Sequence, residues 1–196
     1  LPISARLVKD AGFALILQMM TGLPGSDKET DIDTARRLIA LAPDGVRIYP
    51  TVIVKDTELE ELWRAGAYRE HTADDAVAVC AEILPLFEAA GVPVIRLGLN
   101  PTEELSGGEA VGGAYHPALG ELVRAEIMYR RASALLAGVP VGAGVTVRVA
   151  PDRMSMMIGQ HRVNLKRLKE AFSLASVTVR PDAAAGDEIL VDWKVF

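Results

Sequence analysis

The sequence predicts an α/β protein in two parts: parallel strands alternating with helices, then a small α+β domain. Short apolar runs alternate with amphipathic segments through the first two thirds of the chain, as they do in βαβ units. The segment AGVPVGAG at 137–144 is rich in small residues, Gly and Pro, which is typical of a linker. Net charge is negative before this segment and positive after it. We therefore expect domains at 1–137 and 144–196.

The first part reads as strand, helix, strand, helix, strand with short connections, which favours right-handed crossovers and a parallel sheet. The runs FALILQMM and VRIYPTVIV are continuous and apolar, as in strands that are buried on both faces. Gly12 ends the first helix, and Ser26 or Asp27 caps the next. The expected strands lie at 13–20, 46–54 and 92–99, and the expected helices at 4–11, 28–42, 58–66, 72–90 and 117–136.

The second part changes its pattern. GVTVRVAP alternates apolar and polar residues as a half-buried strand does, and a mostly helical segment follows it. Two further short strands complete a unit of about 50 residues, enough for a small core. The expected strands lie at 144–151, 175–181 and 188–196, with the helical segment at 154–172.

Composition limits the function classes. The chain has 196 residues and a net charge of −5, so as a whole it is no polyanion binder. No apolar run reaches the roughly 20 residues of a membrane span, and no secretory signal opens the sequence. The sole cysteine, Cys80, cannot form an internal disulfide, which suits a reducing cytoplasm. Because the chain begins with Leu1 rather than Met, we expect a processed product or a piece of a longer protein.

The turn QMMTGLPG is a candidate ligand site. It ends the first predicted strand, and RIYPT ends the next. The carboxyl ends of parallel strands lie on one side, where ligands bind in this architecture. Gly22 and Gly25 allow close approach of the backbone, while Tyr49 and Pro50 offer a flat apolar surface. Ordinary turn chemistry and core packing explain the same residues, and the residues alone leave both readings open.

QMMTGLPG, RIYPTVIVKDTELEELWRAGAY and IRLGLNP together resemble the later strands of a radical S-adenosylmethionine enzyme, over roughly residues 1–130. The resemblance is closest to the elongator catalytic subunit group, and weaker to the oxygen-independent coproporphyrinogen oxidases. It implies the later half of a partial (β/α) barrel. It also implies that two sets of residues flank S-adenosylmethionine: Gln18, Met20, Gly22 and Leu23 on one side, and Ile48, Tyr49 and Pro50 along the adenine.

The chain departs from this family at the iron–sulfur cluster. Such enzymes hold a [4Fe–4S] cluster on a C-x-x-x-C-x-x-C run, since thiolates are its ligands. The lone Cys80 has apolar helical neighbours and reads as a buried structural thiol. We therefore expect the intact protein to use S-adenosylmethionine and the cluster, and this chain alone to be inactive. Its open sheet edge would pair with a missing N-terminal segment or with a second copy.

The segment VRVAPDRMSMMIGQHRVNLKRLKEAFSLASVTV resembles a KH RNA-binding motif, in which a GXXG loop clamps the nucleic-acid backbone. Arg162 stands where the second glycine belongs. The implied nucleic-acid residues are Arg153, Gly159, Gln160, His161, Arg162, Lys166 and Lys169. A merely solvated basic surface is the plainer reading of the same residues.

Both resemblances together favour a radical S-adenosylmethionine enzyme that acts on RNA, such as a tRNA-modifying enzyme. The elongator group's acetyltransferase domain has no counterpart in this sequence, so acetyl-coenzyme A is not carried over. Two alternatives stay open: a non-catalytic RNA-binding or scaffold protein on a half-barrel, and a radical enzyme acting on a small molecule. No metal site is expected, because His71, His116 and His161 are scattered along the sequence.

Overall fold

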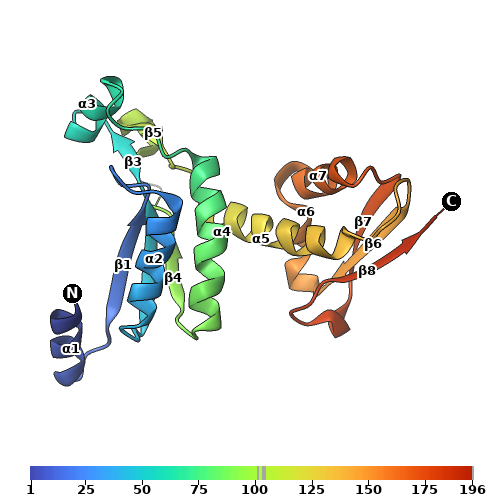
Figure 1. Cartoon of the computed structure of the whole chain (residues 1–196), viewed down its shortest axis with the longest axis horizontal. Coiled ribbons are helices and arrows are strands. Elements are labelled where there is room, and N and C mark those ends of the chain that lie inside the picture. Colours follow the sequence, from blue (N-terminus) through green and yellow to red (C-terminus); the bar gives the residue numbers. More distant parts are fainter. Residues whose placement is uncertain (101, 103–104, 196) are drawn as a thin grey trace. The chain divides into compact units, whose positions relative to one another are not determined.

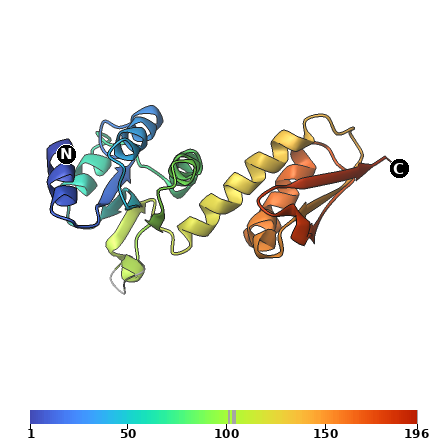
Figure 2. The same cartoon turned by 90° about the horizontal axis from the view of Figure 1, so that it is seen from below.

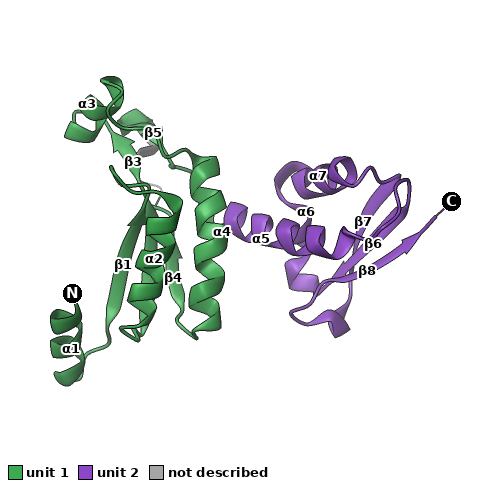
Figure 3. Ribbon diagram, viewed as in Figure 1, with its two compact units in different colours: residues 1–120 green, residues 121–196 purple. Residues whose placement is uncertain are grey.

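The computed structural model describes residues 1–100, 102 and 105–195, and divides into two compact units at 1–120 and 121–196 (Figure 3). Unit 1 contains a parallel sheet in the order β1-β2-β4, with α2 and α4 on one of its faces (Figure 1). This confirms the predicted α/β class with a parallel sheet. The elements of unit 1 are α1 (Pro2–Asp10), β1 (Ile16–Thr21), α2 (Lys28–Ile39), β2 (Gly45–Pro50), β3 (Val52–Val54), α3 (Glu58–Arg64), α4 (Ala73–Ala89), β4 (Val94–Leu97) and β5 (Ala110–Gly113).

The predicted burial of the strands on both faces is wrong for β1. Its residues alternate between exposed and buried, with Leu17, Met19 and Thr21 facing the helices and Gln18 and Met20 facing away. The helices cover one face of the sheet, and no described element covers the other over Met20, which is 38% exposed. An apolar run shows that a strand is hydrophobic, but not that a partner covers both faces. We call this uncovered side the open face.

The predicted strand at 46–54 is interrupted at Thr51. The amide and the hydroxyl of Thr51 both donate to the Thr21 carbonyl, at 3.0 and 2.7 Å. Beyond this point β3 leaves the parallel sheet and pairs antiparallel with β5, so Val52 lies opposite Gly113. The sequence predicts no strand at residues 110–113, because these four small residues show no strand periodicity.

Unit 2 is a three-stranded sheet packed against helices. The strand order is β7-β6-β8, with β6 and β7 parallel and β8 antiparallel to β6. The core lies on the side of Val145, Val147 and Val149, where Met157 and Leu168 are fully buried. Its elements are α5 (Leu119–Leu136), β6 (Gly144–Val149), α6 (Met154–Ile158), α7 (Val163–Ala171), β7 (Ser176–Pro181) and β8 (Leu190–Lys194).

The boundary between the units falls earlier than the linker at 137–144. The later turns of α5 lie in unit 2 beside the strands (Figure 2), and Met128, Ala132 and Leu136 belong to the same buried cluster as Val145. Apolar burial therefore ties this helix to unit 2, although its sequence lies before the Gly- and Pro-rich segment. Within the described part of the chain, no helix is both long and apolar enough to cross a membrane.

Candidate functional site

The turn at 21–26, which we call the Gly22 turn, connects the carboxyl end of β1 to α2. Asp31, in the first turn of α2 and only 4% exposed, accepts two bonds from it. The Gly22 amide donates to Asp31 Oδ2 at 2.9 Å, and Ser26 Oγ donates to Asp31 Oδ1 at 2.6 Å. Asp27 caps α2 by accepting from the Thr30 amide at 2.8 Å. A buried carboxylate held this way fixes the path of the backbone.

The segment between α3 and α4 lies over this turn. The Tyr68 hydroxyl donates to the Gly22 carbonyl at 2.6 Å, and His71 Nε2 lies 3.1 Å from Thr21 Oγ1. Burial lowers the pKa of His71, against the nearby carboxylates of Asp31 and Asp75, which raise it. A pocket of about 530 Å³ lies here, lined by the Gly22 turn, residues 67–71 and the first turns of α2 and α4.

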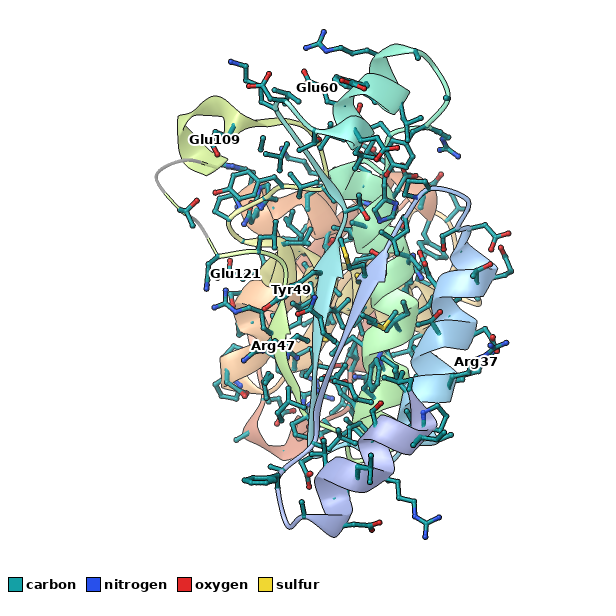
Figure 4. The ribbon with its side chains drawn as sticks, turned by 90° about the vertical axis from the view of Figure 1, so that its left-hand side faces the viewer. Arg37, Arg47, Tyr49, Glu60, Glu109 and Glu121 are labelled. Atoms are coloured by element: carbon teal, nitrogen blue, oxygen red, sulfur yellow. The ribbon has the colours of Figure 1, made fainter. Side chains whose placement is uncertain are left out.

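The open face brings together only part of the predicted cofactor set. Met20 of β1 lies beside Tyr49 of β2, and Gln18 beside Arg47. Figure 4 shows the strands in front of α4, with Arg47 and Tyr49 on β2. Gln18 is exposed, Tyr49 is half-buried, and Leu23 in the turn is 43% exposed. Gln18, Met20 and Tyr49 therefore share the open face, whereas Leu23 lines the pocket at the Gly22 turn.

Two predicted residues lie elsewhere. Ile48 is fully buried on the face that the helices cover, and Pro50 is buried on the same side of β2. Alternate residues of a strand point to opposite faces, so residues 48 and 50 cannot share a surface with residue 49. Ile48 and Pro50 therefore support the sheet from behind, and their side chains do not line the open face.

The residues present do not fit an iron–sulfur cluster. Cys80 is fully buried in α4, and burial raises the pKa of its thiol to about 12. One fully buried thiol cannot supply the three thiolates that hold such a cluster. Among the residues that the structure describes, no group of three or more His, Cys, Asp or Glu side chains could hold a metal ion.

Sequence reasoning missed the polar residues that hold the Gly22 turn in place: Asp31, Tyr68 and His71. Tyr68 ends the segment ELWRAGAY, which carries the family resemblance but gives this tyrosine no role. His71 was considered only as a metal ligand. The one local signal was Asp31, a carboxylate in the first turn of a helix next to a glycine turn, where exposed backbone amides need acceptors.

In unit 2 the predicted GXXG loop is a break between α6 and α7. Gly159 has φ 70° and ψ 163°, a region that is open in practice only to glycine. His161 and Arg162 follow with φ of 52° and 61°. Arg162 thus adopts the left-handed backbone that a second glycine would supply, at a conformational cost of about 1–2 kcal/mol. The loop geometry persists although the glycine is absent.

The predicted basic residues divide into two groups. Arg162, Lys166 and Lys169 are exposed on the loop and on α7, with Gln160 and His161 in the loop beside them. Arg153 is held by Asp187, whose side chain and carbonyl it contacts, so it belongs to an ion pair at the surface of unit 2. The sequence placed Arg153 in the basic group because it lies near the loop in the chain, but its side chain is engaged elsewhere.

Unit 1 therefore has the architecture of a partial (β/α) barrel, with a pocket-lining turn at the carboxyl end of β1. Residues 43–129, which run from just before β2 into α5, match the family model of the Radical_SAM C-terminal domain. This match confirms the predicted resemblance to a radical S-adenosylmethionine enzyme.

Individual relatives agree with this assignment. The chain is 38% identical over 86 residues to Elongator complex protein 3 of Mus musculus, and 33% identical over 79 residues to the tRNA uridine(34) acetyltransferase of Methanocaldococcus jannaschii. These matches cover 42% and 39% of this chain, but only 16% and 15% of the two relatives. The archaeal Methanocaldococcus infernus Elp3 with an N-terminus deletion (1–46) is structurally similar, with a TM-score of 0.55 and 25% identity, covering 66% of this chain and 30% of that one.

Proposed function

We propose that this chain is the C-terminal part of a radical S-adenosylmethionine enzyme that modifies RNA, with tRNA as the favoured substrate. One observation carries the proposal. The segment that matches the Radical_SAM C-terminal domain includes β2 and β4. It also includes Tyr68 and His71, which contact the Gly22 turn. The cluster belongs to the intact protein, because the single buried cysteine of this chain cannot supply the three thiolates that the cluster needs. Cytoplasmic location is part of the proposal and rests on the unpaired cysteine.

In this proposal S-adenosylmethionine lies across the carboxyl half of the open face. Gln18, Met20 and Tyr49 lie under it, and Gly22 and Leu23 lie at its edge. The support is that Gln18, Met20 and Tyr49 are on one face of the sheet, and that an apolar side chain beside a half-buried tyrosine suits a flat purine. Gln18 adds an amide that can donate to or accept from a polar substituent.

The position of the cofactor can be tested with two substitutions on one strand. Met20→Arg adds a cation beside Tyr49, where a sulfonium compound would bind, so affinity for S-adenosylmethionine should fall about tenfold or more, equivalent to about 1.4 kcal/mol. Ile16→Arg is the matched control, because Ile16 is exposed on the same face of β1 at its amino end. Equilibrium dialysis with labelled S-adenosylmethionine measures both. Equal affinities for the two variants would contradict the proposed position.

The RNA part of the proposal rests on the loop between α6 and α7. Three exposed cations, Arg162, Lys166 and Lys169, follow Gly159 on the loop and on α7. The loop keeps a strained left-handed backbone, and such strain is concentrated at functional sites. Phosphates lying along α7 would meet these side chains in turn.

Replacing Arg162 and Lys166 together with Glu should strongly weaken binding of a short single-stranded RNA, as measured by fluorescence anisotropy. Removing two phosphate contacts should also reduce the slope of log affinity against log salt by about 1.4, since each contact on a single strand contributes about 0.7. Arg162→Gly is a milder variant, because it removes the charge and keeps the left-handed backbone available. It should reduce the slope by about half as much.

The matched control for charge is the pair Arg180→Glu and Lys194→Glu, on strands β7 and β8 of the same unit. This pair changes the net charge by the same amount away from the loop. Equal loss of RNA affinity in both pairs would assign binding to net charge alone and would reject the loop as the site. Gly159→Asp is unsuitable as a test, because a Cβ there would lie 2.9 Å from Val163 Cγ1.

The absence of thiolates specifically favours one alternative function, a non-catalytic RNA-binding protein. The dialysis with S-adenosylmethionine and the RNA-binding measurement separate this alternative from the leading proposal. RNA binding that depends on the loop, without any binding of S-adenosylmethionine, supports the alternative. Binding of S-adenosylmethionine without RNA binding instead supports an enzyme that acts on a small molecule.

A further inference from the structure

The segment 67–72 contacts the carboxyl ends of two strands directly and is joined to a third through Thr21. Tyr68 donates to the Gly22 carbonyl at the end of β1, and His71 contacts Thr21, the last residue of that strand. Glu70 Oε1 accepts from the Gly113 amide at 2.7 Å, at the end of β5. The Thr21 carbonyl in turn receives both donors of Thr51, directly after β2. A stretch with no helix or strand of its own is therefore joined to β1 and β5 directly, and to the end of β2 through Thr21.

Gly22 is fixed on each of its sides. Its amide donates to Asp31 and its carbonyl accepts from Tyr68. Its φ is +71°, and a Cβ at this position would lie 2.0 Å from Cγ of His71. The imidazole thus occupies the space that any side chain at residue 22 would need. The turn has one conformation while the ring and the hydroxyl stay in place.

We propose that Tyr68 and His71 are positioning residues that clamp the Gly22 turn in the conformation it presents to a ligand. The identity of that ligand, S-adenosylmethionine, rests on the proposed function; the clamp itself rests on the contacts above. The clamp also gives a role to the tyrosine that ends the segment ELWRAGAY. That role is to hold the backbone of a turn that lies 46 residues earlier in the chain.

The clamp should depend on pH through His71. The groups that face the ring are Thr21 of β1, Asp31 of α2, Asp75 of α4 and Arg69 of its own segment. Burial lowers the pKa of His71 below its ordinary value of 6.5, so the folded state favours the neutral ring. A histidine whose pKa is lowered by folding contributes stability that is complete above about pH 6.5 and is lost as pH falls through the lowered value. The turn should therefore loosen in acid.

Hydrogen exchange of the whole chain without ligand tests the clamp. The Gly22 and Thr51 amides report on it, because they donate to Asp31 and to the Thr21 carbonyl. Tyr68→Phe removes only the hydroxyl and should lower the protection factor of the Gly22 amide about fivefold. In the wild type this protection should fall between about pH 7 and about pH 5. His71→Gln keeps a group that can bond Thr21 but does not titrate. In this variant the protection of the Gly22 amide should stay near the wild-type value at neutral pH and should not fall as the pH is lowered.

The matched controls are Tyr129→Phe, in unit 2, and His116→Gln, whose imidazole accepts from the Ala118 amide. Both should leave Gly22 protection and its pH dependence unchanged. Unchanged protection in Tyr68→Phe, or equal pH dependence in wild type and His71→Gln, would overturn the clamp. Dialysis with S-adenosylmethionine on the same variants keeps the two proposals apart. If no variant binds it while protection changes as expected, the clamp stands and the proposed ligand is wrong.

Discussion

Replacing Gly22 with Ala should lower the free energy of unfolding of unit 1 by about 2–4 kcal/mol. Two costs add. A φ of +71° is unfavourable for alanine, and the new methyl group would lie 2.0 Å from Cγ of His71, so the ring must move. Moving the ring breaks its contact with Thr21 and opens a gap over the turn. Urea unfolding followed by the fluorescence of Trp63, in a Trp193→Phe background, reports on unit 1 alone.

Gly25 in the same turn provides the control. Its φ is +77°, but nothing lies within 4 Å of a Cβ built there. Gly25→Ala should therefore cost only the backbone term, about 1 kcal/mol. Adding His71→Ala to Gly22→Ala should recover part of the loss, because it removes the clash. A Gly22→Ala variant no less stable than Gly25→Ala would show that the ring does not constrain the turn.

Replacing Asn164 with Leu should destabilise unit 2 by about 3 kcal/mol. Asn164 is 1% exposed, and its amide donates to the Ala125 carbonyl of α5 at 2.8 Å and to the Met156 carbonyl of α6 at 3.3 Å. Leucine is similar in size but cannot donate, so two backbone carbonyls would lose a partner in a dry interior. A buried acceptor left without a donor costs about 1–3 kcal/mol.

Trp193 fluorescence, in a Trp63→Phe background, follows the unfolding of unit 2 for this variant. Glu170→Ala is the control on the same helix, because Glu170 is exposed and its change should stay within about 0.5 kcal/mol. A cost for Asn164→Leu that is as small as for Glu170→Ala would mean that water or a shift of α6 satisfies both carbonyls. The junction of the three helices would then depend on apolar packing alone.

Sequence periodicity predicted the order and type of the main elements, because strands and helices bury apolar residues at different intervals. It did not predict what covers each face. FALILQMM is as apolar as a strand that is buried on both faces of its sheet, yet Met20 is on the open face. It also missed β5, where Gly112 and Gly113 pair with β3 through backbone groups that side-chain patterns do not show.

The local chemistry of the candidate site could be predicted from the sequence. Glycines after a buried strand mark a turn that can approach a ligand, and Gly22 is held at such a turn. The sequence could not show that Tyr68 returns to the same turn, because that contact depends on the lengths of α2, β2 and α3 between them. The family resemblance placed Ile48 beside the cofactor, but its side chain lies on the face that the helices cover. Its neighbour Tyr49 lies on the open face, and a shift of one residue along a strand reverses the side.

The burial of Cys80 makes the chain convenient for site-specific labelling. A fully buried thiol with a pKa of about 12 is almost unreactive toward maleimides at neutral pH, and the sequence has no other cysteine. A cysteine introduced at the exposed Gln18 would therefore take up a fluorophore with no competing site and without prior removal of the native thiol. A dye attached there would lie on the open face and report directly on whatever binds to that surface.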